Sequence, residues 1–215
     1  MEGRIAVILE DLIRRYPVLS ENKAQIAEVY EILKECYDRD GKLLIAGNGG
    51  SCADADHIVG ELMKTFRKRR PVPEALRQKL MEADPEEGAV LSEKLGGSLT
   101  ALSLAAQHSL HTAFANDVDG EYIYAQQVLG YGRKGDVYFA ISTSGNSRNV
   151  LHAVPVAHAL GMKVIGLTGK TGGKLKTAAD AVITVPAAET YQIQELHLPV
   201  YHALCMMLEE TYFEE

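Results

Sequence analysis

Tryptophan is absent from the 215-residue sequence, cysteine occurs three times, and no apolar run approaches the length of a membrane span. A membrane-crossing helix needs about 20 consecutive apolar residues, so we expect no membrane contact. The N-terminal residues MEGRIAVILEDLIRRYP lack the basic-then-apolar order of a signal peptide. The cysteines, Cys36, Cys52 and Cys205, are odd in number and form no CxxC pair, which argues against a disulfide framework. These features predict a cytoplasmic protein.

Positive charge is also scarce. The chain carries 22 lysine and arginine residues against 29 aspartate and glutamate residues, a net charge of -7. Because nucleic-acid binding depends on basic side chains that neutralise phosphates, this balance argues against nucleic acid as the main ligand. A phosphorylated metabolite needs only local positive potential and stays open. With 47% hydrophobic residues, the chain is long enough for one α/β domain with a substantial core.

Residues 42–67, KLLIAGNGGSCADADHIVGELMKTFR, have the order of a buried strand, a tight polar loop and a helix. Residues 43–46 form a continuous apolar run, as expected of a strand that is buried on both faces. Glycines at 47, 49 and 50 allow a ligand to approach the main chain. The helix, expected over about 52–66, would present its N-terminus to that loop, which is a natural arrangement for binding an anion.

His57 and Glu61 lie four residues apart in this helix and therefore share one face just behind the loop. A histidine and a glutamate beside an anion site are acid–base groups or metal ligands. The alternative is an ordinary pair on the helix surface. The basic run Arg67–Arg70 follows, and it is either the solvated end of the helix or an attractant for an anionic substrate.

The same order of elements recurs farther along the chain. Apolar residues 137–141 lead into the polar loop 142–147 and then into a helix over about 148–160. A third strand begins at Lys163, and another is expected over 181–185. Strands that alternate with helices predict an α/β fold with a doubly wound parallel sheet flanked by helices. Ligands bind such sheets at the carboxyl ends of the strands, where both polar loops lie.

The remaining segments are expected to complete a single domain over residues 1–215. Residues 1–40 would form two N-terminal helices, and 71–98 a charged surface insertion or lid. Asn116 and Asp117 open a turn signal that follows an apolar stretch. A C-terminal helix is expected over about 191–210.

Neither of two common phosphate-binding motifs fits the polar loops. The dinucleotide fingerprint GxGxxG is broken at Cys52, and the Walker A pattern is broken at Val164. The loop 142–147 instead offers four hydroxyls without an obligatory lysine, which suits one phosphate monoester better than a triphosphate with magnesium. The alternative is an ordinary turn. The hydroxyls belong to Ser142, Thr143, Ser144 and Ser147.

Three motifs, GNGGSCADADH, ISTSGNS and QELHLPVYH, resemble those of the SIS (sugar isomerase) domain family, and most closely those of its phosphoheptose isomerases. The similarity runs over about residues 1–210, apart from the stretch near 71–98. It implies a flavodoxin-like three-layer sandwich and an aldose–ketose isomerase that interconverts sedoheptulose 7-phosphate and a heptose 7-phosphate. It also implies a homo-oligomer, with a tetramer favoured.

The resemblance further implies roles for individual residues. Glu61 and His202 would be the catalytic base and acid. Zinc would be bound at positions His57, Glu61, Gln194 and His202. The sugar phosphate would be bound by Asn48, Gly49, Gly50, Ser51, Glu61, Asn116, Asp117, Ser142, Thr143, Ser144, Ser147 and Gln194.

The chemistry of these side chains agrees with that assignment in part. Aldose–ketose isomerisation moves a proton between adjacent carbons, so it needs a carboxylate near the substrate and a second group that serves the oxygens. Glu61 and His202 are of the right types, and imidazole and carboxylate also suit zinc. Glutamine is an unusual zinc ligand, and Gln194 would stand about 12 Å from His202 along a continuous helix.

Two features depart from the family pattern. Tyr191 occupies a position where the heptose isomerases usually carry aspartate, and the segment 71–98 is longer than in compact members. Both bear on the choice of substrate rather than on the type of reaction. The alternatives are therefore an SIS enzyme that acts on another sugar phosphate, and a non-catalytic SIS adaptor that binds a partner. An adaptor has no need of His57, Glu61 and His202.

Overall fold

The computed structural model describes residues 3–213, which form one five-stranded parallel sheet in the order β2-β1-β3-β4-β5. In the central pairings, Leu44 lies opposite Leu102 on one side and Tyr138 on the other. The predicted doubly wound α/β fold is confirmed, and the strand order reverses between β1 and β3, where ligands bind such sheets. The strands are β1 (Leu43–Ala46), β2 (Ala101–Ser103), β3 (Val137–Ile141), β4 (Lys163–Thr168) and β5 (Ala181–Thr184).

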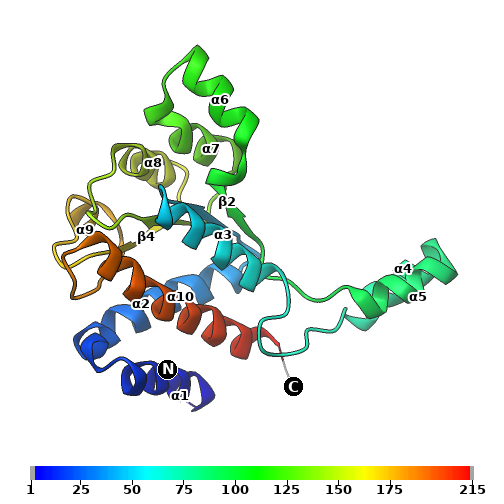
Figure 1. The fold of residues 1–215 in the computed structure, drawn as a ribbon. Coiled ribbons are helices and arrows are strands. Elements are labelled where there is room, and N and C mark those ends of the chain that lie inside the picture. Colours follow the sequence, from blue (N-terminus) through cyan, green and yellow to red (C-terminus); the bar gives the residue numbers. More distant parts are fainter. Residues whose placement is uncertain (1–2, 214–215) are drawn as a thin grey trace.

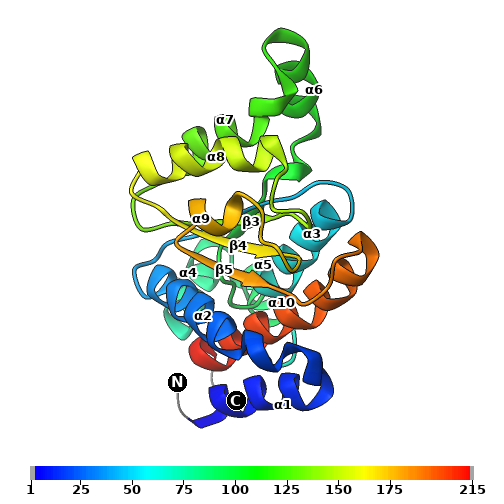
Figure 2. The same ribbon diagram turned by 90° about the vertical axis from the view of Figure 1, so that its left-hand side faces the viewer.

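Helices cover both faces of this sheet (Figures 1 and 2). One face carries α2 (Lys23–Tyr37), α3 (Gly50–Met63) and α10 (Thr190–Tyr212), with α1 (Gly3–Arg15) packed on their outer side. The other face carries α7 (Ile123–Tyr131), α8 (Arg148–Ala159) and the short α9 (Leu175–Ala178), while α6 (His108–Asp117) projects beyond α7. Short 3-10 helices connect these elements: η1 (Pro17–Asn22), η2 (Leu104–Ala106) and η3 (Gly120–Tyr122).

The sheet divides the core into two apolar clusters. All five residues of β3 are buried, and successive side chains of a strand point to opposite faces. Phe139 therefore packs with α2, α3 and α10, whereas its neighbours Tyr138 and Ala140 pack with α7 and α8. This two-sided burial explains why β1 and β3 are continuous apolar runs rather than alternating ones.

The segment 71–98 contains a helical hairpin, α4 (Glu74–Ala83) and α5 (Pro85–Lys94), that extends away from the sheet (Figure 1). Asp84 begins α5, because its carboxylate accepts hydrogen bonds from the backbone amides of Glu86 and Glu87 at 3.1 and 3.0 Å. Gly88 is the only residue of these two helices that is buried. The two helices thus pack on each other and leave most of their surface exposed.

The strand β2 is not among those that the sequence predicts. Its three residues are too few to show a hydrophobic period, and they become a strand because β1 offers them an open edge. The predicted helix over 52–66 begins earlier, at Gly50, directly at the end of the glycine loop.

Candidate active site

Two helices that are far apart in the sequence, α3 and α10, lie side by side on the same face of the sheet (Figure 2). The first turn of α3 meets the second turn of α10, because a Cβ atom on Gly50 would overlap the side chain of Gln194. Two turns farther along both helices, His57 meets Tyr201 and His202. The helices therefore run in the same direction and bring the two predicted catalytic segments together.

His57, Glu61 and His202 form one cluster at this helix contact. The Nε2 atom of His57 is 3.2 Å from Oε1 of Glu61 and 3.4 Å from Nε2 of His202. The Glu61 side chain is only 11% exposed, and its Oε2 atom accepts a hydrogen bond from Lys64 at 3.1 Å. A largely buried carboxylate beside two imidazoles is equipped for proton transfer. The structure brings these three residues together.

Burial shifts the ionisation of groups around this cluster. The pKa of His202 is lowered, first because burial disfavours the charged ring and then because His57 lies beside it. The pKa of Asp54, in the second turn of α3, is raised by burial, while a hydrogen bond from Tyr201 opposes that shift. Both shifts favour the neutral forms of these groups in a partly desolvated site.

A buried ion pair holds the C-terminal end of α3 against α10. Arg70 donates to the carboxylate of Glu209 on α10 at 2.9 Å and to the carbonyl oxygens of Glu61 and Leu62 at 2.9 and 2.7 Å. These carbonyls belong to the last turn of α3, where carbonyl oxygens have no hydrogen-bond donor within the helix. The side chains of Arg70 and Glu209 are 0% and 2% exposed. Neither interpretation of the run Arg67–Arg70 therefore holds for Arg70, which is neither solvated nor open to an anion.

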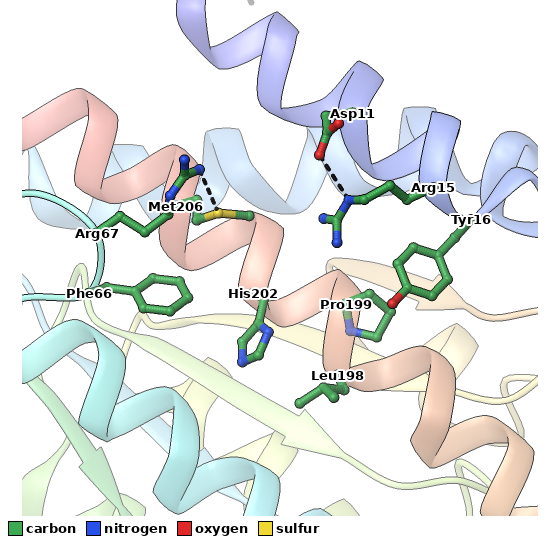
Figure 3. Close-up of a pocket in the computed structure, with 9 residues that line it drawn as sticks. All are labelled: Asp11, Arg15, Tyr16, Phe66, Arg67, Leu198, Pro199, His202 and Met206. Carbon is green, nitrogen blue, oxygen red and sulfur yellow. Dashed lines mark hydrogen bonds and ion pairs between the residues drawn. The ribbon is translucent and has the colours of Figure 1, made fainter.

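A cavity of about 420 Å³ lies beside His202 on the α1 side of α10 (Figure 3). Arg15 from α1 and Arg67 from the segment after α3 extend toward it from different elements. Arg15 is held by Asp11 at 2.8 Å, and an Nη atom of Arg67 lies 3.2 Å from the Met206 sulfur. His202 thus lies between the cluster of His57 and Glu61 on one side and this cavity, lined by two guanidinium groups, on the other.

The loop after β1 reaches the carboxyl edge of the sheet with the backbone exposed. Gly49 precedes α3 with φ of 56°, a left-handed conformation that glycine adopts without strain. Asn48 and Asn149, from the start of α8, exchange two hydrogen bonds of 2.8 Å. Ser51 is buried. This amide pair connects the two polar loops that the sequence predicts at one site.

The loop after β3, residues 142–147, leads into the N-terminus of α8. Ser142 and Ser147 hydroxyls lie 2.9 Å apart, and the Ser144 hydroxyl accepts from the Asn146 backbone amide at 3.1 Å. Gly145 allows the loop to turn back on itself with φ of 65°. The hydroxyls and the positive end of the α8 dipole thus gather at one place, as an anion site requires.

A cavity of about 350 Å³ opens between the two loops. Arg148, the first residue of α8, lies in its wall and pairs with Glu121 at 2.8 Å. The cavity is lined by Asn48, Gly120, Glu121, Ser147, Arg148 and Asn149. Arg148 and Asn149 were not predicted from the sequence, although both directly follow the hydroxyl loop.

Asn116 and Asp117 end α6, and both are exposed. The Asn116 side chain donates to Asp117 at 2.8 Å. Asp117 is three positions before Gly120, which lines the cavity, so it lies within about 10 Å of that wall. The structure therefore places this pair near the rim of the cavity rather than in its lining.

Gln194 is the one predicted zinc ligand that stands apart. Its amide packs against Gly50 at the start of α3, whereas His57 lies two turns farther along that helix. Within residues 3–213, no three His, Cys, Asp or Glu side chains are arranged as a ready metal site. The structure thus groups His57, Glu61 and His202 with each other, and Gln194 with the glycine loop.

Comparison with known proteins defines the class. A family described as the SIS domain matches residues 96–209. Together with the parallel sheet and the two polar loops at its carboxyl edge, this match makes the chain an SIS-domain protein.

The similarity to individual relatives is more specific. A phosphoheptose isomerase of Thermodesulfovibrio yellowstonii is 36% identical over 215 residues, which are 100% of this chain and 94% of that protein. One from Laribacter hongkongensis is 38% identical over 92% of this chain and 89% of its own length. The solved structure of a phosphoheptose isomerase from Francisella tularensis has a TM-score of 0.75 at 30% identity, covering 96% of this chain and 97% of that one. The chain belongs to the phosphoheptose isomerase family.

Proposed function

We infer that this protein is an aldose–ketose isomerase that converts sedoheptulose 7-phosphate into a heptose 7-phosphate. The observation that carries the proposal is the buried Glu61 carboxylate beside His57 and His202, in a chain whose relatives are phosphoheptose isomerases. The same cluster favours an enzyme over a non-catalytic adaptor, which would gain nothing from a desolvated acid–base group.

The phosphate is proposed to bind at the loop 142–147. Ser142, Thr143, Ser144 and Ser147 supply hydroxyls there, and the N-terminus of α8 supplies positive potential. The cavity between the loops would then hold the sugar chain, with the backbone of Gly49, Gly50 and Ser51 on one side. Asn48, Asn116, Asp117 and Gln194 are proposed to contact its hydroxyls.

Glu61 is proposed to move the carbon-bound proton. Its carboxylate takes a proton from the carbon next to the ketose carbonyl, which leaves an enediol, and then delivers a proton to the former carbonyl carbon after exchange with solvent. His202 gives a proton to the carbonyl oxygen and accepts one from the neighbouring hydroxyl. The lowered pKa of His202 keeps its ring neutral and able to accept a proton near neutral pH. The sum of these transfers moves the carbonyl by one carbon without an external oxidant.

Zinc is proposed at His57, Glu61 and His202. Ligand atoms on a tetrahedral zinc with bonds of about 2.0–2.1 Å stand about 3.3 Å apart, and His57 Nε2 lies 3.2 and 3.4 Å from its two neighbours. These two spacings match those between zinc ligands, although the three side chains would have to adjust to form a complete site, and Gln194 would have to move from Gly50 to reach it. When bound, zinc would polarise the substrate carbonyl. Elemental analysis of protein prepared without an affinity tag tests this, and full activity after chelation would refute a catalytic metal.

The finer statements on assembly and location are proposals as well. The exposed apolar residues Leu76, Met81 and Val90 of the hairpin support a homo-oligomer, for which we propose a tetramer. Light scattering of the purified protein tests this, and a monomer would contradict it. No helix within residues 3–213 is long and apolar enough to span a membrane, and we propose a cytoplasmic location.

Solvent-deuterium exchange followed by NMR tests the reaction. We expect sedoheptulose 7-phosphate to exchange the proton next to its carbonyl only when the enzyme is present. The second candidate is an isomerase for a different sugar phosphate, which the exposed Tyr191 in the first turn of α10 favours. Exchange with a five- or six-carbon sugar phosphate but not with sedoheptulose 7-phosphate would establish that alternative.

A further inference from the structure

The hydroxyl of Tyr201 lies between an acid and a base. Tyr201 is 1% exposed and precedes His202 on α10. Its hydroxyl is 3.2 Å from Oδ1 of Asp54 and 3.0 Å from Nδ1 of His57. Asp54 and His57 are three residues apart on α3, so one turn of that helix presents both groups to the same hydroxyl.

A phenol has one proton to donate, and this fixes the direction of the chain of hydrogen bonds. The Tyr201 hydroxyl donates to Oδ1 of Asp54, which in its ionised form can only accept. The phenol oxygen then accepts from His57, which must carry its proton on Nδ1. In a neutral imidazole, the other nitrogen is then a bare acceptor. Nε2 of His57 therefore presents a lone pair to Glu61 and His202.

The surroundings of Asp54 support this direction. Its second oxygen, Oδ2, is buried and has no hydrogen-bond partner among the described residues. A buried carboxylate oxygen without a partner costs free energy. The hydrogen bond from Tyr201 to the other oxygen, Oδ1, offsets part of that cost.

We propose that Tyr201 and Asp54 are positioning residues that hold His57 as its Nδ1–H tautomer, with the Nε2 lone pair directed at the cluster of Glu61 and His202. This goes beyond the proposed reaction, and it rests on that proposal only in treating this cluster as the catalytic centre. The arrangement prevents His57 from satisfying Glu61 with an Nε2–H bond. It keeps the carboxylate available for a proton or for a cation. A hydrogen-bond partner on one ring nitrogen sets the orientation and basicity of a histidine that binds metal through the other.

The substitution Tyr201→Phe separates this role from packing. The Tyr201 ring makes edge contacts with His57 and His202 at centroid distances of 5.5 and 5.1 Å, and phenylalanine retains them. Asp54→Leu is the complementary change, because it keeps the Tyr201 hydroxyl but frees its proton for donation to His57. Tyr138→Phe is the control, since it removes a buried hydroxyl that donates to the Val150 carbonyl on the other face of the sheet.

Long-range nitrogen–proton NMR spectra of the full-length, metal-free protein report the tautomer directly, with His57 assigned from its loss in His57→Asn. At a pH where the ring is neutral, we expect the proton on Nδ1 in the wild type and in Tyr138→Phe. Both Tyr201→Phe and Asp54→Leu should shift it to Nε2. An Nε2–H tautomer in the wild type, or an unchanged tautomer in both variants, would overturn the proposal.

Zinc affinity gives a second readout that does not depend on turnover. Competition with a chelator should show a loss of about 10- to 100-fold in Tyr201→Phe and no loss in Tyr138→Phe. Equal affinities in the wild type and Tyr201→Phe would count against the positioning role. A wild type that shows the Nδ1–H tautomer but exchanges no sugar phosphate would refute the proposed function alone. Sugar exchange with an unchanged tautomer in both variants would refute the positioning role alone.

Discussion

The two polar loops at the carboxyl edge of the sheet share a local design and differ in their surroundings. Each follows a buried strand, turns at a glycine with positive φ and leads into a helix. The helix after the first loop, α3, packs against α10 and carries its functional side chains into a half-buried corner. The second loop stays near solvent, and its hydroxyls contact one another and the backbone. We call these regions the α3–α10 corner and the 142–147 loop.

The difference shows how one fold separates two tasks. Proton transfer needs groups that are held rigidly and partly desolvated, and the α3–α10 corner supplies this with a buried ion pair and a chain of hydrogen bonds. Phosphate binding needs accessible donors and a helix dipole, and the 142–147 loop supplies accessible hydroxyls at Ser144 and Ser147, although Ser142 is buried. Substitutions in the corner should therefore alter stability and turnover, and substitutions in the loop should alter binding.

The largest effect is expected from Arg70→Met in the α3–α10 corner. It leaves Glu209 charged, 2% exposed and without its ion-pair partner, and such a change costs about 3–5 kcal/mol of unfolding free energy. Denaturant titration measures it. The matched control is Lys34→Met, which breaks an exposed pair between α2 and the following residue Asp38 and should change the unfolding free energy little, because solvent screens that pair. Similar losses in both variants would show that the corner is not the rigid region.

Acidification should destabilise the same corner through His197. This residue is 0% exposed on α10, and burial lowers its pKa from 6.5 to about 4. Because the unfolded chain binds the proton more tightly, its contribution is fully present above pH 6.5 and is lost as the pH falls toward 4. The total is about 3 kcal/mol.

Denaturant titrations at several pH values should show that slope in the wild type and a smaller one in His197→Leu. Neither ring nitrogen of His197 has a hydrogen-bond partner of good geometry among the described residues, and the Thr168 backbone only weakly opposes the effect of burial on its pKa, so leucine removes no strong bond. Identical pH dependence in the two proteins would exclude His197 as its source.

Glu61→Gln tests the chemical role of the corner. Glutamine keeps the size and much of the hydrogen bonding of Glu61 but cannot accept the carbon-bound proton. We expect kcat to fall about 100-fold or more while substrate binding survives. Steady-state kinetics and the deuterium-exchange assay measure it, with Glu195→Gln, an exposed position on α10, as the control. Exchange that persists in Glu61→Gln would remove the role given to this carboxylate.

The smallest effect is expected in the 142–147 loop. The double variant Ser144→Ala/Ser147→Ala removes two hydroxyls from the proposed phosphate site, and each such hydrogen bond contributes about 0.5–1.5 kcal/mol. Substrate affinity should therefore fall by about 10-fold, with an unchanged unfolding free energy because neither side chain is in the core. Unaltered affinity would place the phosphate elsewhere, and a large loss of stability would end the distinction between the two regions.

The fold was predictable because its signals are short-range. Continuous apolar runs at 43–46 and 137–141 predict buried parallel strands, and the glycine and serine loops after them predict where a ligand binds. The same signals fail for β2, whose three residues form a strand only because β1 is beside them. They also misplace Arg70, since an isolated run of basic residues gives no indication that Glu209 and two helix carbonyls will enclose one of them.

The sequence by itself therefore determined the doubly wound sheet, the two loops and the types of residue that a sugar phosphate isomerase would use, because backbone periodicity and turn chemistry act over a few residues. Only the tertiary structure decided that His57 and His202, 145 positions apart, face each other, and that Gln194 lies instead at Gly50. It also decided that the Tyr201 hydroxyl reaches both Asp54 and His57. These contacts depend on the axial register of α10 against α3, that is, on which turns of the two helices lie opposite each other. That register is set by burial over the whole length of both helices, and no local stretch of sequence encodes it.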